Sequence, residues 1–285
     1  MFISIITPTY NRGGYPFLKD LCQSIAIAKK YEHIDLEHLI VNDGSNDNTE
    51  QVILDMQKTF PFIKYLKNAE NKGITFSKNH ALREAKGELV MDVDDDDIIP
   101  FYAIGLRSGM LQKSEKMWLC GNALKITEAG MLQFTDNLLG YGIEDTWKCF
   151  RAFYEGKIFA YAGTRLYYKE ALERIQGWNE DISSLCEDFD LWLRLISSCG
   201  SPAFCPIPLI YWREKECSLG IDALKSGAYL SAVAAIKSCY RAYYEEACNH
   251  VSHTHVVQLI GKNDRDVHQL AVNVKSGRAP GSPRS

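Results

Sequence analysis

The first hundred residues alternate between two hydrophobic periods, and this alternation constrains the fold more than any other feature. Four short apolar runs, rich in β-branched residues and with little polar alternation, are typical of strands buried on both faces. These runs are Phe2–Ile6, Leu39–Val41, Ile63–Leu66 and Leu89–Val93. Between them, apolar residues recur at helical spacing, as at Leu18, Leu21, Cys22 and Ile25. Alternating strands and helices predict an α/β fold with a mostly parallel, doubly wound central sheet.

The second half of the chain continues this pattern less regularly. Beyond Pro100 we predict helices over 101–112 and 188–198, with short strands over 118–126, 161–168 and 207–213. We interpret residues 101–220 as an elaboration of the same sheet, so that residues 1–220 form one domain with halves 1–100 and 101–220. An Ala- and Tyr-rich stretch, 222–248, predicts a helical extension within 221–271, and residues 272–285 are expected to be disordered.

The composition of the 285 residues is that of an ordinary globular protein, with 46% hydrophobic and 24% charged residues. The net charge of -4 gives no overall basic field, so we expect no nucleic acid partner. No apolar run approaches the roughly 18 residues that span a bilayer, and the first residues lack the features of a signal peptide. We expect a protein without a transmembrane segment, for which attachment to a membrane surface stays open.

The nine cysteines form no C-x-x-C pair, and their number is odd. This usage suits a reducing compartment better than secretion, so we expect a cytoplasmic location. A free cysteine packs like a small hydrophobic residue, and we interpret these thiols as mostly buried and not as a zinc site.

Polar residues follow three of the predicted strands. The first strand is followed by TPTYNR, the second by NDGSNDNT and the fourth by DVDDDD. Ligands of open α/β sheets bind beyond the carboxyl ends of the strands, so Thr7, Thr9, Asp43 and the aspartates are predicted to share one site. Neither G-x-G-x-x-G nor G-x-x-x-x-G-K-[ST] occurs, which removes the main support for a dinucleotide-binding or P-loop protein.

The acidic run, Asp92–Asp97, is the strongest single signal. Neighbouring carboxylates repel one another, and a hard divalent cation such as Mg²⁺ or Mn²⁺ is the natural partner, held by one or two carboxylates plus substrate phosphates. A solvated acidic turn is the alternative. An EF-hand is excluded, because loop position 6 is Asp97 instead of Gly and position 12 is Ala103 instead of Glu.

The ordered set of motifs resembles family 2 glycosyltransferases of the GT-A fold. The set comprises SIITPTYNR, VNDGSNDNT, NKGITFSKNHALREAKGE with the following strand and DVDDDD, and GWNED before CEDFDLWLRL. The resemblance spans roughly residues 2–218. It implies a GT-A fold, a nucleotide-sugar site in the first half and an acceptor site in the second.

The resemblance also implies roles for residues of the nucleotide-sugar site. Thr7, Thr9 and Tyr10 match the loop that lines the nucleobase, and Asp43 matches the acid that accepts a hydrogen bond from the uracil N–H. Residues that match the segment reaching the ribose and diphosphate are Asn71, Gly73 and Lys78. For Lys78, an exposed helix lysine is the alternative, and for Asp43 a turn aspartate beside Gly44.

The register of the family's D-x-D motif within the acidic run is open by two residues. Counting from Gly87 places the motif on Asp94, for the ribose, and Asp96, for the metal. The alternative places it on Asp92 and Asp94. Asp95 is assigned to the nucleotide-sugar site as well, and a position facing water or capping the next turn is the alternative for Asp95 and Asp97.

In the second half, the resemblance implies that Asp188 is the base that deprotonates the acceptor hydroxyl, with Glu187 as its partner or as a sugar ligand. A helix N-cap is the alternative for Asp188. Trp178 is assigned to stacking on a sugar, with a core position as the alternative. Lys215 stands in the stretch YWREKECS where the family usually has a histidine, and a lysine can neutralise a diphosphate but cannot ligate a metal while charged.

The predicted function is metal-dependent, inverting transfer of a sugar from a UDP- or dTDP-sugar to an acceptor hydroxyl of a glycan, lipid-linked or protein acceptor, in polysaccharide or glycoconjugate synthesis. Two alternatives stay open. A nucleotidyltransferase would need a Gly-rich, basic loop after the first strand, where only Arg12, Gly13 and Gly14 occur. A non-catalytic binding protein of the same fold is the second alternative, and the acidic run together with Asp188 argues against it.

Overall fold

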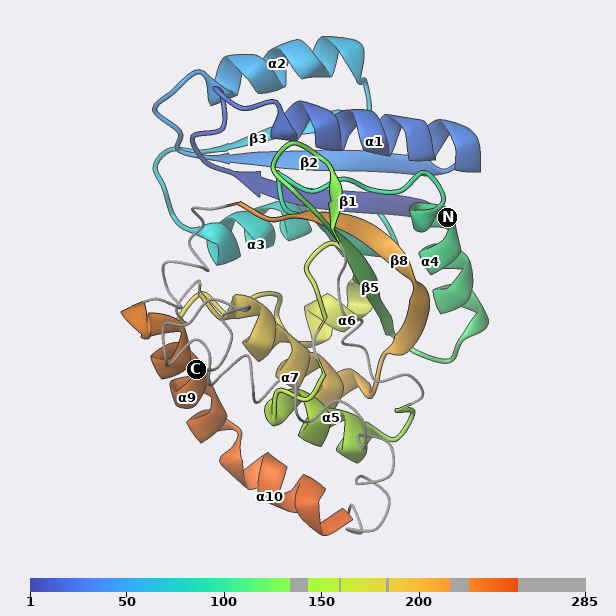
Figure 1. Ribbon diagram of the computed structural model, residues 1–285, viewed down its shortest axis with the longest axis vertical. Coiled ribbons are helices and arrows are strands. Elements are labelled where there is room, and N and C mark those ends of the chain that lie inside the picture. The colour runs from blue at the N-terminus through green and yellow to red at the C-terminus, as the bar shows by residue number, and fades with distance from the viewer. Residues whose placement is uncertain (134–142, 159, 183–184, 216–225, 251–285) are drawn as a thin grey trace, which may run out of the picture.

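A mixed sheet runs through the computed structural model of the protein, which describes residues 1–133, 143–158, 160–182, 185–215 and 226–250 (Figure 1). In those residues the sheet has eight strands, in the order β3-β2-β1-β4-β7-β5-β6, with β8 pairing with β5. Four strands from the first half are parallel and confirm the predicted core of the fold. They are β1 (Phe2–Thr9), β2 (Asp35–Asp43), β3 (Ile63–Asn68) and β4 (Leu89–Asp92).

The strands of the second half join the same sheet, as predicted. β7 (Leu166–Tyr168) lies antiparallel between β4 and β5 (Trp118–Ile126). β8 (Ala203–Arg213) pairs parallel with β5. β6 (Leu132–Gln133) pairs antiparallel with the C-terminal end of β5. The predicted strand over 161–168 was too long, because Gly163 has a φ of 75° and the Thr164 N–H bonds to the Tyr161 carbonyl in a turn.

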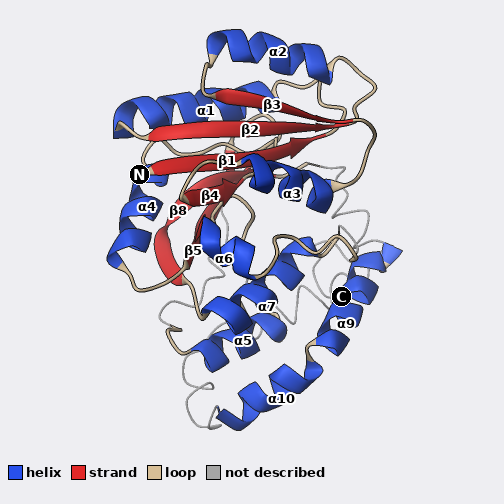
Figure 2. Cartoon of the chain, turned by 180° about the vertical axis from the view of Figure 1, so that it is seen from behind, coloured by secondary structure: helices blue, strands red, loops and turns tan. Residues whose placement is uncertain are grey.

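Helices cover both faces of the sheet (Figure 2). One face carries α1 (Phe17–Glu32), α2 (Thr49–Thr59) and α4 (Ala103–Lys113), packed on residues such as Ile5 and Ile40. The other face carries four helices, packed on residues such as Leu39 and Val41. These are α3 (Ile74–Glu84), α5 (Thr146–Tyr154), α6 (Lys169–Arg174) and α7 (Glu187–Cys199). The opposite placement of Ile40 and Leu39 follows from the two-residue period of a strand.

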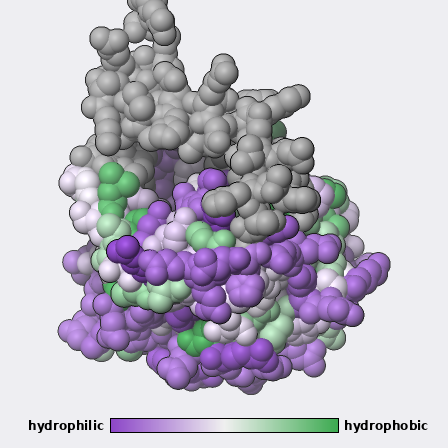
Figure 3. All heavy atoms as spheres, turned by 90° about the horizontal axis from the view of Figure 1, so that it is seen from below, coloured by the Kyte–Doolittle hydropathy of each residue, from purple (hydrophilic) through white to green (hydrophobic). Residues whose placement is uncertain are grey.

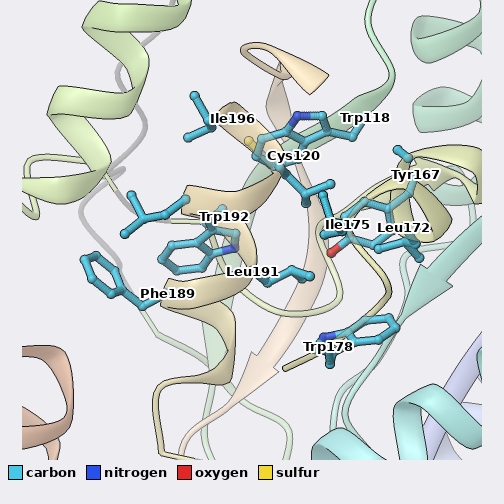
Figure 4. Packing of buried hydrophobic residues seen from close by; sticks show 14 of the residues in the cluster. Trp118, Cys120, Tyr167, Leu172, Ile175, Trp178, Phe189, Leu191, Trp192 and Ile196 are labelled. Carbon is cyan, nitrogen blue, oxygen red and sulfur yellow. The ribbon is translucent and has the colours of Figure 1, made fainter. Parts of the chain in front are cut away.

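The core between α7 and the sheet is aromatic. Figure 4 shows Phe189 and Trp192 of α7 entering the same cluster as Trp118 and Tyr167 of the sheet, whose rings stack with centroids 6.5 Å apart. Burying one such side chain contributes about 1.5–3 kcal/mol to the free energy of unfolding. This packing fixes α7 against β7, and therefore fixes the position of the first turn of α7.

Two helices extend the chain after the sheet, where one helix over 222–248 was predicted. They are α9 (Ala228–Cys239) and α10 (Arg241–His250), separated at Tyr240. α10 packs on α5 through stacked rings, with Trp147 4.9 Å from Tyr243 between centroids. The face seen from below is mostly hydrophilic, with small, separate apolar patches in its described part (Figure 3). None of the described helices has the length and apolar character needed to cross a membrane.

All residues after His250 lie outside the described residues, including the predicted tail 272–285. Cys217 lies outside them as well. The described cysteines are all free thiols. Five of them are buried, as predicted, namely Cys22, Cys120, Cys149, Cys186 and Cys205. Cys199 and Cys248 are half-buried, and Cys239 is exposed.

Candidate functional site

The loop after β1 is bonded to the acidic run, so the predicted polar edge exists. The Thr9 hydroxyl donates to Asp95 Oδ2 at 2.7 Å. The Arg12 guanidinium holds the same carboxylate, with Nε 3.1 Å from Oδ2. Asn11 turns the chain between them in the left-handed region, with a φ of 53°. Tyr10 is exposed beside this pair and free to contact a ligand.

Thr7 lies deeper than the rest of this loop. It is fully buried, and its hydroxyl is 2.9 Å from Nε2 of His38, which is itself inaccessible. Burial lowers the pKa of His38 to about 3, so the imidazole is neutral at physiological pH. The Thr7 side chain therefore bonds within the interior in this structure. Thr9 is also buried, and of the three residues only Tyr10 is exposed.

Asp43 organises the loop that contains Asn71 and Gly73. Its Oδ2 accepts the Gly73 N–H at 2.8 Å, and its Oδ1 accepts the Lys72 N–H at 2.9 Å. Asn68 Nδ2 donates to the same Oδ1 at 2.7 Å. The structure thus brings three of the predicted donor-site residues together, with Asn71 exposed at the rim.

Three carboxylates of the acidic run, Asp92, Asp95 and Asp97, are held by cationic or backbone partners. Asp92 is fully buried between Lys78 and Arg165, and Asp95 is held by Arg12. Asp97 accepts the Arg213 N–H at 3.0 Å, and burial raises its pKa well above the usual value. Because Asp95 and Asp97 are both buried, the alternative that they face water is wrong.

Asp96 and Asp94 differ from their neighbours. Asp96 Oδ2 pairs with the ammonium of Lys215 and lies 3.9 Å from Arg12 Nη2. The Asp94 carboxylate has no hydrogen bond or ion pair within the described ranges, and burial raises its pKa to about 7, with the charges of Asp96 and Asp188 adding to the effect. An unpartnered carboxyl beside Asp96 fits an incoming cation.

Lys78 joins the two halves of the chain. It lies on α3, and its ammonium is 3.2 Å from Asp92, 3.4 Å from Glu187 and 3.9 Å from Asp188. The alternative of an exposed helix lysine is wrong, since the side chain is fully buried. Burial alone would lower the pKa of Lys78, but the three carboxylates outweigh it and raise the pKa above the usual value.

A second buried cation, Arg165, lies beside Lys78. Its Nη2 is 2.7 Å from Asp92 Oδ2, and its Nη1 is 2.8 Å from Asp188 Oδ1. The Tyr167 hydroxyl donates to the other Asp92 oxygen at 3.1 Å. Burial alone would raise the pKa of Asp92, but Arg165 and Lys78 outweigh it and hold that pKa below the usual value.

The first turn of α7 presents Glu187 and Asp188 to these cations. The helix begins at Glu187 with Cys186 as its N-cap residue, so capping does not describe the role of Asp188. Burial raises the pKa of Glu187 to about 7, and the neighbouring charge of Asp188 adds to the effect. The Asp188 side chain is 26% exposed, so it is open to a ligand on one side.

Trp178 lies in the core, with 2% of its surface exposed. The Asn79 side chain holds the backbone of Trp178, because it accepts the backbone N–H and donates to the backbone carbonyl, both at 2.8 Å. Lys78 Nζ is 5.6 Å from the centre of the indole, within the range of a cation–π contact. The core alternative therefore describes the position of Trp178, and its ring forms the wall beneath Lys78.

The described residues contain no group of three His, Cys, Asp or Glu side chains that would hold a metal by themselves. An ion of the Mg²⁺ type needs only one or two carboxylates and takes its other ligands from water and substrate phosphates. Asp94 and Asp96 supply such a pair, whereas both Asp92 oxygens are already bonded to protein groups. The residues present fit a divalent cation bound together with a diphosphate.

Sequence reasoning missed Arg165, Tyr167 and Arg213 as members of the site. Arg165 and Tyr167 stand in or beside a three-residue strand, and no local pattern marks them as neighbours of Asp92. Arg213 ends β8, where its Nε donates to the Asp96 carbonyl at 2.8 Å. For Arg213, the sequence did offer one signal, because YWREK stands at the end of a predicted strand, where site residues are expected.

A family model described as Glycosyl transferase family 2 matches residues 4–175. The GalNAc(5)-diNAcBac-PP-undecaprenol beta-1,3-glucosyltransferase of Campylobacter jejuni is 30% identical over 198 residues, which cover 68% of this chain and 59% of that relative. The Escherichia coli UDP-Glc:alpha-D-GlcNAc-diphosphoundecaprenol beta-1,3-glucosyltransferase WfgD is 30% identical over 120 residues, 42% of this chain and 45% of that protein. The chain thus spans less than two thirds of the length of these relatives.

Solved structures share the fold. S. aureus TarS in complex with UDP-GlcNAc superposes with a TM-score of 0.65 at 20% identity, covering 96% of this chain and 79% of TarS. The mannosyltransferase PcManGT from Pyrobaculum calidifontis, in complex with GDP-Man and Mn2+, gives a TM-score of 0.59 at 18% identity, covering 98% and 76%. These likenesses confirm the GT-A fold predicted from the motifs.

Proposed function

Because the chain belongs to glycosyl transferase family 2, we propose that it transfers a sugar from a nucleotide diphosphate sugar to an acceptor hydroxyl with inversion at the anomeric carbon. One observation carries the proposal beyond the family. Lys78 lies within 3.9 Å of Asp92 from the first half and of Glu187 and Asp188 from the second, so candidate donor and acceptor groups share one site.

A UDP-sugar is the donor we favour, with dTDP-sugars as the second choice. Asp43 and the Gly73 loop form a rigid polar corner at the end of β2 that suits a planar base with an N–H donor. Thr9, Tyr10 and Asn71 lie on the same edge of the sheet. TarS with UDP-GlcNAc supports this choice by analogy of fold, and the undecaprenol-linked substrates in the relatives' names support a lipid-linked glycan acceptor.

Asp96, with Asp94 beside it, would hold a Mn²⁺ or Mg²⁺ ion when the donor is bound. Such an ion supplies Lewis-acid stabilisation of the negative charge on the departing diphosphate. The chain adds its own cations on the same side. Lys215 pairs with Asp96, and Arg12 lies between Asp95 and Asp96, so both can contact diphosphate oxygens after small rotations.

Asp188 would act as the general base. Its Oδ1 is bonded to Arg165, and its Oδ2 has no partner in the part of the chain that the structure describes. That oxygen can accept the proton of an acceptor hydroxyl as the hydroxyl attacks the anomeric carbon opposite the diphosphate. Glu187 lies beside it, where it can accept a hydrogen bond from a sugar hydroxyl. Trp178 contributes only the wall beneath Lys78, because its ring is buried.

The test compares Asp188→Asn with Asp181→Asn, an exposed acid of the same half. An amide cannot accept the proton, so Asp188→Asn should lower turnover of UDP-sugar by at least about a hundredfold while UDP affinity persists. Asp181→Asn should leave both quantities unchanged. Near-normal turnover in Asp188→Asn would remove it from the mechanism, and loss of UDP binding would make it a substrate ligand.

The two alternatives predict other products. A nucleotidyltransferase would release pyrophosphate, whereas a glycosyltransferase releases the nucleoside diphosphate. A non-catalytic protein would bind UDP without consuming the sugar nucleotide. The cytoplasmic location stays a prediction that rests on the cysteine usage.

A further inference from the structure

Arg165 makes a bridge between two carboxylates that belong to different elements. One nitrogen of its guanidinium bonds Asp92 at the end of β4, at 2.7 Å, and another bonds Asp188 in the first turn of α7, at 2.8 Å. The side chain has no exposed surface. A guanidinium is planar and its donors are fixed relative to one another, so it transmits the position of one carboxylate to the other.

Asp92 is a rigid reference point for this bridge. Its backbone is part of the parallel ladder through its pairing with Ile6, and its carbonyl accepts the Gly163 N–H at 3.0 Å. Tyr167 holds its Oδ1, and Lys78 lies 3.2 Å from its Oδ2. The Asp92 side chain therefore cannot move without breaking several buried contacts.

The bridge leaves Asp188 with one occupied oxygen and one available oxygen. Oδ1 is bonded to Arg165 and is 3.9 Å from Lys78, and Oδ2 has no partner among residues 1–133, 143–158, 160–182, 185–215 and 226–250. The guanidinium carbon of Arg165 lies over the ring of Trp192, 6.0 Å from its centre. Both buried cations thus approach the Asp188 carboxylate at Oδ1, and the hydrogen bond from Arg165 restrains its rotation.

We propose that Arg165 is the positioning residue for Asp188, orienting its carboxylate so that Oδ2 meets the acceptor hydroxyl. The inference rests on the proposed function, because it assumes that Asp188 is the base. Arg165 itself transfers no proton, since a guanidinium stays protonated in proteins. Its loss leaves Asp188 free to rotate, and misplacement of a reacting group by about 1 Å costs roughly a hundredfold in rate.

The experiment uses Arg165→Met and Arg165→Lys in the full chain, with Arg194→Met as the matched control. Arg194 also belongs to an ion pair of α7, with Nε 2.6 Å from Asp190 Oδ2, but it does not touch Asp188. Arg165→Met should lower kcat by roughly a hundredfold, with UDP affinity and the KM for the donor within about threefold of wild type. Arg165→Lys should recover part of kcat, because it keeps the charge.

A double-mutant cycle separates positioning from general support of the fold. In the Asp188→Asn background, Arg165→Met should cause no further loss of kcat, since two residues that act as a unit are not additive. A full additional loss, or an equal loss in Arg194→Met, would overturn the proposal. If Arg165→Met does not fold, Arg165→Lys decides the question. Wild-type kcat in that variant would overturn the proposal as well.

The same cycle distinguishes the two proposals. Near-normal turnover in Asp188→Asn alone contradicts the general-base role of Asp188 in the proposed function. An inactive Asp188→Asn together with a fully active Arg165→Met contradicts only the role of Arg165.

Discussion

The ammonium of Lys215 pairs with Oδ2 of Asp96, the carboxylate on which the metal proposal rests. A divalent ion at Asp96 has to compete with this ammonium, and a diphosphate that arrives with the ion offers Lys215 another partner. The pair therefore couples metal binding to nucleotide binding.

Replacing Lys215 by Ala should tighten Mn²⁺ binding to the free protein and weaken the binding of UDP, because the same cation opposes the first and assists the second. Calorimetry with Mn²⁺ alone and then with UDP measures both. Lys125→Ala is the matched control, since Lys125 pairs with Glu214. Unchanged Mn²⁺ affinity in Lys215→Ala would show that the ion does not use Asp96.

Asp96→Ala removes the carboxylate that is proposed to hold the metal, and the same calorimetry measures its effect. It should remove manganese-dependent binding of UDP while the fold persists. Retained metal-dependent affinity would move the metal to Asp94, the carboxyl without a protein partner among the described residues.

Asp43→Ala should change both base selectivity and stability. The preference for UDP over ADP should fall, and the partly buried N–H groups of Lys72 and Gly73 lose this acceptor, which costs about 0.5–1.5 kcal/mol per hydrogen bond in the free energy of unfolding. Asp47→Ala is the matched control, because Asp47 also accepts backbone N–H groups in this region. An equal loss of affinity for both nucleotides would contradict base recognition by Asp43.

Lys78→Met should destabilise the protein more than any exposed lysine substitution. It leaves Asp92, Glu187 and Asp188 with one buried cation instead of two, and removal of one member of a buried ion pair typically costs about 3–5 kcal/mol. Urea denaturation measures the effect, with the exposed Lys58→Met as control. A loss no larger than that of the control would mean that the buried carboxyls neutralise themselves by taking up protons.

His38 should make the protein sensitive to acid. Its pKa is about 3 in the folded protein against about 6.5 in the unfolded chain, so only the unfolded chain gains a proton as the pH falls below about 6.5. Stability is lost progressively from there down to about pH 3. At pH 5 the loss is about 2 kcal/mol.

The comparison of wild type with His38→Gln isolates this contribution from the opposite effect of Asp94 and Glu187, whose raised pKa values favour the folded state in acid. Between pH 7.5 and 5, urea denaturation should show a steeper fall in wild type than in His38→Gln. His33→Gln retains His38 and should follow wild type. Parallel curves for wild type and His38→Gln would show that the histidine is charged when folded.

The sequence predicted the elements whose signal is local. The β-branched runs located β1 to β4, and the position of Asp43 at a strand end located one side of the site. Asp190 and Arg194 stand four residues apart in the predicted helix over 188–198, a spacing that favours an ion pair. The structure contains this pair, with Arg194 Nε 2.6 Å from Asp190 Oδ2. α5 was missed although Asp145 caps it by accepting the Lys148 N–H, a signal that spacing could have supplied.

Other features depend on contacts that no local pattern contains. The spacing of Asp47 and Glu50, three residues apart before an apolar helical pattern, is that of a capping box. The structure does not form one, because Asp47 accepts the Thr49 N–H and Glu50 pairs with Lys67 on β3. The burial of Lys78 depends on three carboxylates from β4 and α7. A charged residue at a helical position is ordinarily solvated, so its place in the interior could be known only once those elements were brought together.

β7 limits how the two halves of the chain can move relative to each other. Its two antiparallel pairings connect β4 of the first half to β5 of the second, so the two halves share a single hydrogen-bonded sheet. A hinge rotation of one half against the other would have to break that ladder. We therefore expect any closure over a ligand to involve the loops at the edge of the sheet, with the framework beneath them unchanged.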